Sequence, residues 1–162
     1  MDDLPRFQVS ECPWINLTRL VKIKPMQTTP FTPLDPQDLE LIEAAADVIR
    51  RNYDTDRHSV GAALRGASGR IYTGVNIDSC AYGPCAEPVA LGAAISNGER
   101  EFTAIVAVVG DTFAVLPPCG NCRQMLFDYM PDVSVILEVD GQRVKTKISD
   151  LLPAPYRGFH ER

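Results

Sequence analysis

Two cysteine motifs, each directly after a proline, constrain this chain more than any other feature of its sequence. The first reads Pro84-Cys85-Ala86-Glu87 and the second reads Pro118-Cys119-Gly120-Asn121-Cys122. Apolar residues at helical spacing follow the first motif as far as Gly98, and Pro131 ends the segment after the second. Both motifs are therefore predicted at the starts of helices. The partial positive charge of a helix N-terminus favours thiolate over thiol, so this placement suits metal-binding cysteines.

The other elements alternate between helical and strand patterns. Asp35-Pro36 is typical of an N-cap and first helical residue, and a helix is predicted to run to about Asn52. Strands are predicted at 59–64, 70–75, 104–109, 134–139 and 143–147, with a hairpin turn at Asp140-Gly141 and a short closing helix at 148–152. This order predicts an α/β fold, a three-layer α-β-α sandwich around a mixed five-stranded sheet.

The size and charge of the chain exclude several classes of function. Its 162 residues suit one globular domain. The net charge of -5 disfavours a nucleic-acid partner, which usually needs a basic face. The longest strongly apolar stretch, 104–109, is far short of the roughly 20 residues that cross a bilayer. The first residues lack a secretion signal, and three of the cysteines have metal-ligand spacing, so we expect a reduced, cytoplasmic setting.

The domain organisation is predicted to be simple. Residues 1–34 are rich in proline, show no clear period and are interpreted as an N-terminal extension, either flexible or produced by an upstream start before Met26. A partner-binding arm around Trp14 is the functional alternative for this segment. Residues 35–162 are predicted to form a single catalytic domain.

The spacing of the cysteines predicts a catalytic metal site. Cys119 and Cys122 lie in one helical turn, so both sulfurs can reach one ion, and Cys85 supplies a third ligand. Structural zinc usually has four protein ligands, whereas catalytic zinc keeps one position open for water. Glu87 shares the first turn with Cys85 and can move the protons that hydrolysis of an aromatic amine requires. Two alternatives stay open: a redox pair at Cys119 and Cys122, and a structural zinc module with Cys80 as the fourth ligand.

These motifs resemble those of cytidine deaminases. The similarity lies in Cys85-Ala86-Glu87 and in the run from Pro118 to Gln124, and it extends through weaker matches over residues 38–156. The resemblance implies the cytidine deaminase fold, Zn²⁺ held by Cys85, Cys119 and Cys122, and Glu87 as the catalytic proton carrier. It also implies a small-molecule nucleoside substrate and a homotetramer whose neighbours help to build each pocket. Nucleic-acid editors of this superfamily generally carry His-x-Glu instead.

The same resemblance implies a set of substrate-binding residues. Asn76 and Asp78 stand where the family uses Asn-x-Glu to hold sugar hydroxyls, and the backbone near Ala86 is expected to read the base. The loop before Cys85 is short and similar to that of blasticidin S deaminases, which also use the positions of Ser59 and Tyr156 around their substrate. From the overall resemblance to cytidine deaminases, we expect a free cytosine nucleoside, cytidine or deoxycytidine, as substrate. Blasticidin S or another aminopyrimidine nucleoside is the alternative.

Four further residues bear on this choice. Phe113 stands where blasticidin S deaminase has an arginine suited to the carboxylate of the drug, which favours cytidine over the drug. Pro88 replaces an arginine that offsets thiolate charge in many three-cysteine deaminases, so helix N-termini and Arg123 are the candidates for that role. Arg123 could equally form a surface ion pair. His58 is either a substrate contact or a satisfied surface histidine.

Overall fold

The computed structural model describes residues 30–157, and its first element is the helix α1, Pro36–Asn52. Asp35 caps this helix, because its carboxylate accepts hydrogen bonds from the backbone amides of Gln37 and Asp38. The Asp38 carboxylate accepts in return from the backbone amide of Asp35, which completes a capping box. The predicted helix from Asp35-Pro36 to Asn52 is confirmed.

One mixed sheet forms the centre of the molecule. Its main strands follow the order β2-β1-β3-β5-β6, and only β3 and β5 pair in parallel. The strands are β1 Val60–Gly66, β2 Ile71–Val75, β3 Phe102–Val109, β5 Ser134–Val139 and β6 Gln142–Lys147. The predicted five strands are confirmed, and so is the β5–β6 turn, where Asp140 and Gly141 both have positive φ. A sixth strand of two residues, β4 Val115–Leu116, was not predicted and pairs with β3.

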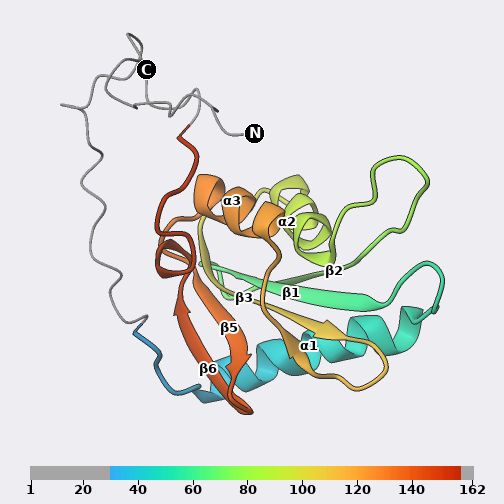
Figure 1. The fold of residues 1–162 in the computed structure, drawn as a ribbon, viewed down its shortest axis with the longest axis horizontal. Coiled ribbons are helices and arrows are strands. Elements are labelled where there is room, and N and C mark those ends of the chain that lie inside the picture. Colours follow the sequence, from blue (N-terminus) through green and yellow to red (C-terminus); the bar gives the residue numbers. More distant parts are fainter. Residues whose placement is uncertain (1–29, 158–162) are drawn as a thin grey trace, which may run out of the picture.

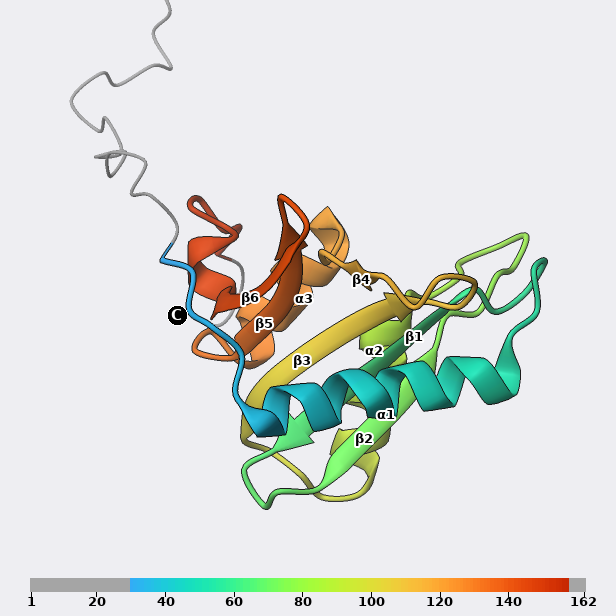
Figure 2. The same ribbon diagram turned by 90° about the horizontal axis from the view of Figure 1, so that it is seen from below.

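Helices cover both faces of the sheet, which gives the predicted three layers (Figure 1). The helices α2, Ala86–Ser96, and α3, Gly120–Tyr129, lie together on one face, and α1 crosses the other (Figure 2). Strand β1 shows why two cores result: Ala62 and Leu64 pack towards α2 and α3, whereas Ala63 packs towards α1. The closing segment is a single 3₁₀ turn, η3 Ile148–Asp150. Within residues 30–157, no helix has the length and apolar character needed to span a membrane.

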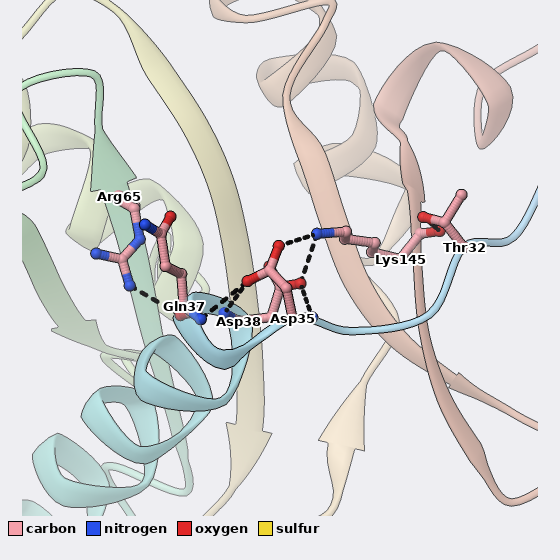
Figure 3. A network of polar contacts seen from close by, with 6 residues as sticks. All are labelled: Thr32, Asp35, Gln37, Asp38, Arg65 and Lys145. Carbon is pink, nitrogen blue, oxygen red and sulfur yellow. Dashed lines mark hydrogen bonds and ion pairs between the residues drawn. The ribbon is translucent and has the colours of Figure 1, made fainter.

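A network of charges fastens the start of α1 to the edge strand β6 (Figure 3). The Lys145 ammonium lies 2.6 Å from the buried carboxylate of Asp38 and 2.7 Å from that of Asp35. The backbone of Thr32 exchanges two hydrogen bonds of 2.9 Å with that of Lys145. Thr32 belongs to the predicted N-terminal extension, so the last part of that extension pairs with β6. The predicted boundary between the extension and the domain at residue 34 stays a prediction. Trp14 and Met26 lie outside the described residues.

Candidate metal and active site

The first cysteine motif begins α2 as predicted. Cys85 is the N-cap residue with an extended backbone, Ala86 is fully buried, and Glu87 follows at 6 % exposure. The helix approaches the sheet closely at this end. A side chain on Gly74 of β2 would place its Cβ 2.5 Å from the backbone nitrogen of Ala90, so only glycine permits this spacing. The close contact between α2 and β2 therefore sets the position of Cys85 and Glu87.

The second cysteine motif begins α3, and the strand β4 directly before it places it next to the first cysteine motif. Leu116 of β4 pairs with Ala107 of β3, and two prolines then lead to Cys119, the N-cap residue of α3. The sulfur of Cys119 accepts a hydrogen bond of 3.5 Å from the backbone amide of Cys122. The short strand β4 thus brings a helix start from one part of the chain beside that of α2.

The three predicted ligands come together. The sulfurs of Cys85, Cys119 and Cys122 all lie within 4.8 Å of one another. The sulfurs of Cys85 and Cys119 are 3.7 Å apart, much further than the roughly 2.05 Å of a disulfide. Two sulfurs bound to a tetrahedral zinc at about 2.3 Å lie about 3.8 Å apart, so the observed separation fits a zinc site. Cys80 is exposed in the loop before α2 and does not belong to the cluster, which argues against a four-cysteine structural site.

Electrostatics at the cluster favour a bound cation. Burial raises the pKa of the Cys85 thiol, and hydrogen bonding with Cys119 adds to the rise. Burial also raises the pKa of Cys122 far above its usual range, with a further contribution from the negative charge of Glu87. For Cys119, burial opposes ionisation, but hydrogen bonds from the backbone and side chain of Cys122 lower the pKa overall. A bound divalent cation offsets the unfavourable effect of burial on ionisation of the thiols, because it supplies the positive charge that stabilises the thiolates.

A cavity of about 220 Å³ opens beside the cluster. Glu87, Cys85 and Cys119 line one side of it. Burial raises the pKa of Glu87, against a smaller opposing effect of hydrogen bonds from its own backbone amide and from Cys122. A raised pKa brings a carboxyl group closer to the range in which it can both accept and donate a proton, which suits a general acid–base. Apolar side chains of Val60, Ala107 and Leu116 line the cavity as well.

Asn76 is held rigidly at the other side of the cavity. Its Oδ1 accepts hydrogen bonds of 2.7 and 2.8 Å from the backbone amides of Ser59 and Val60, which fixes the orientation of the amide. Its Nδ2 has no hydrogen-bond partner within the described part of the chain, so a donor remains for a ligand. His58 binds the Asn76 carbonyl oxygen through Nδ1 at 2.7 Å, which assigns it a structural role and fixes its tautomer.

The structure places the predicted substrate residues in two groups. Asn76, Asp78 and Ala86 line the cavity. Ser59 and Tyr156 do not line it: Ser59 contributes its backbone amide to Asn76, and the Tyr156 side chain is 71 % exposed beside α3. The apolar wall at Val60 and Leu116 was missed, because its residues come from separate strands with no shared local pattern. The one available signal was the apolar pair Val115-Leu116 directly before two prolines.

Residues 35–138 match the family described as the cytidine and deoxycytidylate deaminase zinc-binding region. The chain belongs to the cytidine deaminase family. It is 41 % identical over 132 residues to a blasticidin-S deaminase of Bacillus cereus, covering 76 % of this chain and 94 % of that protein. It is 42 % identical over 104 residues to a cytidine deaminase of Halalkalibacterium halodurans, covering 62 % and 78 %. The crystal structure of a cytidine deaminase from Mycobacterium leprae superposes with a TM-score of 0.63 at 30 % identity, covering 74 % of this chain and all of that one.

Family membership and geometry agree on the cofactor. The chain is a zinc-dependent hydrolase of the cytidine deaminase family, a class that acts on cyclic amidines, and its zinc is bound by three cysteines. The redox-pair interpretation of Cys119 and Cys122 is set aside by the same findings. The charge-offsetting role considered for Arg123 finds no direct contact in the structure: its guanidinium donates to the backbone oxygens of Pro118 and Leu151.

Proposed function

We propose that this chain catalyses the hydrolytic deamination of a free cytosine-type nucleoside, releasing ammonia and the corresponding uracil-type product. The observation that carries the proposal is the placement of the buried Glu87 carboxyl in one cavity with Cys85 and Cys119. Zinc held by the three cysteines supplies Lewis acidity that activates water for attack on the amine-bearing carbon. The proposed catalytic residue is Glu87, and Cys85, Cys119 and Cys122 are the proposed ligands.

Glu87 carries the protons of this reaction. Its carboxylate accepts a proton as water adds to the ring carbon and donates it to the neighbouring ring nitrogen. Glu87 then takes the proton of the new hydroxyl group and gives it to the amino group, the carbon–nitrogen bond breaks, and ammonia leaves as the carbonyl forms. The low exposure of Glu87 keeps solvent from competing for the proton.

The remaining residues of the cavity bind and orient the nucleoside. Asn76 offers its Nδ2 donor and Asp78 its carboxylate to sugar hydroxyls, while the buried backbone at Ala86 reads the base. The apolar wall of Val60, Ala107 and Leu116 suits the faces of a pyrimidine ring. At about 220 Å³ the cavity is smaller than the roughly 300–1,000 Å³ typical of ligand sites. In the proposed tetramer, neighbouring subunits add walls to the sugar side of the cavity and so enlarge it. Ser59 and Tyr156 are proposed to act at that side. The enzyme is proposed to be cytoplasmic.

We place blasticidin S ahead of cytidine and deoxycytidine as the proposed substrate. The similarity to the Bacillus cereus blasticidin-S deaminase extends over 94 % of that protein, whereas the match to the cytidine deaminase of Halalkalibacterium halodurans covers 78 % of it. Phe113 is an apolar residue at the position where blasticidin S deaminase has an arginine, and in the sequence it favours cytidine over the drug. In the structure Phe113 packs against the core beneath α1 and does not line the cavity, so its apolar ring does not stand against the drug.

A substrate panel tests both the class and the order of substrates. The purified, zinc-loaded protein is incubated with blasticidin S, cytidine, deoxycytidine, cytosine and an adenine nucleoside, and ammonia release is followed. We expect the highest kcat/KM for blasticidin S, a lower value for the two cytosine nucleosides and none for the adenine nucleoside. A higher kcat/KM for cytidine than for blasticidin S would reverse the order. Absence of ammonia from all five, with one zinc per chain, would refute the proposed function.

A further inference from the structure

The segment that follows η3 returns along α3, and the side chain of Gln124 binds its backbone. The Oε1 atom of Gln124 accepts a hydrogen bond of 2.8 Å from the backbone amide of Tyr156, and its Nε2 donates one of 2.8 Å to the Tyr156 carbonyl. The side-chain amide thus pairs with the backbone of Tyr156 through both a donor and an acceptor. Nε2 also donates to the Asp128 carboxylate at 2.7 Å, which holds the amide in this orientation.

The residue before Gln124 connects the same segment to the zinc ligands. Arg123 follows Cys122 directly, and its Nε donates a hydrogen bond of 2.9 Å to the Pro118 carbonyl, immediately before Cys119. Its guanidinium also donates to the Leu151 carbonyl at 3.4 Å. Leu151 itself packs against the core on this face of the sheet. One turn further along α3, the Arg157 guanidinium lies 5.9 Å from the Phe127 ring centroid. Residues 151–157 are therefore fastened along α3, starting beside its two cysteines.

We propose that Gln124 is a positioning residue for the zinc site. By holding Tyr156 it keeps residues 151–157 against α3, which keeps the Leu151 carbonyl in place for Arg123. Arg123 in turn holds the Pro118 carbonyl and so the turn that presents Cys119. The inference rests on the ligand assignment in the proposed function and extends it to a residue that touches neither metal nor substrate.

The physical reason lies in the exposure of the ligands. Cys119 is the exposed member of the cluster, whereas Cys122 is buried in the helix. Release of a metal begins with the movement of one ligand away from it, and the exposed sulfur at the helix start has the most freedom to move. Contacts outside the ligand shell that restrict such movement change metal affinity by about 10–100-fold. The Gln124–Tyr156 pair is placed to supply this restriction.

The test measures zinc release from the full-length, zinc-loaded protein into an excess of a chromogenic zinc chelator. Gln124→Ala is expected to release zinc on the order of ten times faster than the wild type. Asn52→Ala is the matched control, because it also removes an amide that donates to a backbone oxygen, that of Val48 at 2.7 Å, at the end of α1 on the opposite face of the sheet. This control should leave the release rate unchanged whatever its effect on the melting temperature.

A second variant tests whether Gln124 acts through Tyr156. Tyr156→Pro lacks the backbone amide that donates to Gln124 and should also speed zinc release. If both act through one contact, the double variant releases zinc no faster than the faster single variant. A wild-type release rate in Gln124→Ala, or additive rates in the double variant, would overturn the inference. Zinc release needs no substrate, so this result is separate from the substrate panel: a protein that deaminates none of the five compounds can still show the effect.

Discussion

Gly74→Ala is expected to impair catalysis from a position on β2 that does not line the cavity. The new Cβ would lie 2.5 Å from the backbone nitrogen of Ala90 and 2.9 Å from the Ala86 carbonyl oxygen, and neither is a flexible side-chain end. Restoring an ordinary contact of 3.4 Å moves α2 by about 0.9 Å. A displacement near 1 Å of a catalytic group costs roughly 100-fold in rate. Overpacking of this kind also costs about 1–3 kcal/mol of stability.

The assay compares kcat and the melting temperature of Gly74→Ala with those of Gly92→Ala. Gly92 lies in α2, the helix that Gly74 of β2 contacts, but a Cβ at Gly92 meets no atom within 4 Å. Alanine in a helix interior is favoured over glycine by about 0.5–1 kcal/mol, so Gly92→Ala should keep its activity and gain stability. Gly74→Ala should lose about 100-fold in kcat while it remains folded with one zinc per chain.

Two outcomes would refute the reasoning. Full activity in Gly74→Ala would mean that the close contact between β2 and α2 does not set the position of Glu87. An equal loss of activity in Gly92→Ala would mean that any added methyl group on α2 impairs the enzyme, so the contact at Gly74 would have no special role.

Three further predictions follow from the site and from the charge network. Glu87→Gln should lower kcat by about 100- to 10,000-fold and keep one zinc per chain by metal analysis, whereas zinc loss would indicate a structural role. Removal of zinc with a chelator should abolish activity and lower the melting temperature, and added zinc should restore both. Lys145→Met should destabilise the fold by about 1–3 kcal/mol at pH 7 in urea unfolding, because it leaves the buried Asp38 carboxylate without its cation. Lys145 also pairs with Asp35, and its hydrogen bond lowers the pKa of that carboxyl. The part of the stability that comes from the Lys145–Asp35 pair is therefore present above the usual carboxyl pKa of about 3.9 and is lost as the pH falls through the lowered value, so the difference between wild type and Lys145→Met should shrink in acid.

Local signals in the sequence were sufficient for most of the fold. The capped helix from Asp35, the Asp140-Gly141 hairpin and both helix starts each depend on residues close together in the chain, and all are observed. Strand β4 was missed because two residues are too few to show a period, and its pairing with Ala107 is a long-range contact. The end of the last helix was also overestimated, since a single 3₁₀ turn gives no helical repeat.

In the candidate site, too, the features that depend on residues close together in the chain were predictable, and those that depend on long-range contacts were not. The zinc ligands were predictable because two of them share one turn and the third shares a turn with Glu87. The role of Asn76 was only partly predictable, since the two backbone amides that bind its side chain belong to the start of the neighbouring strand β1. The contact at Gly74 could not be predicted at all, because the sequence gives no distance between a strand and the helix that packs on it.

The structure also indicates how the charge of three thiolates is balanced in a chain with Pro88 at the position of the usual arginine. Within residues 30–157, no arginine or lysine side chain is found in hydrogen-bonding contact with the three sulfurs, and Arg123 is committed to carbonyl oxygens. Two of the ligands, Cys85 and Cys119, instead occupy the N-cap positions of α2 and α3. Each helix N-terminus stabilises a nearby negative charge by about 0.3–1 kcal/mol when exposed and up to about 2 kcal/mol when partly buried. Two such helix starts, together with the Cys122 amide on the Cys119 sulfur, place positive potential on the thiolates without a cationic side chain. This arrangement is compatible with Pro88, because proline is tolerated in the first turn of a helix, where no backbone amide hydrogen bond is lost.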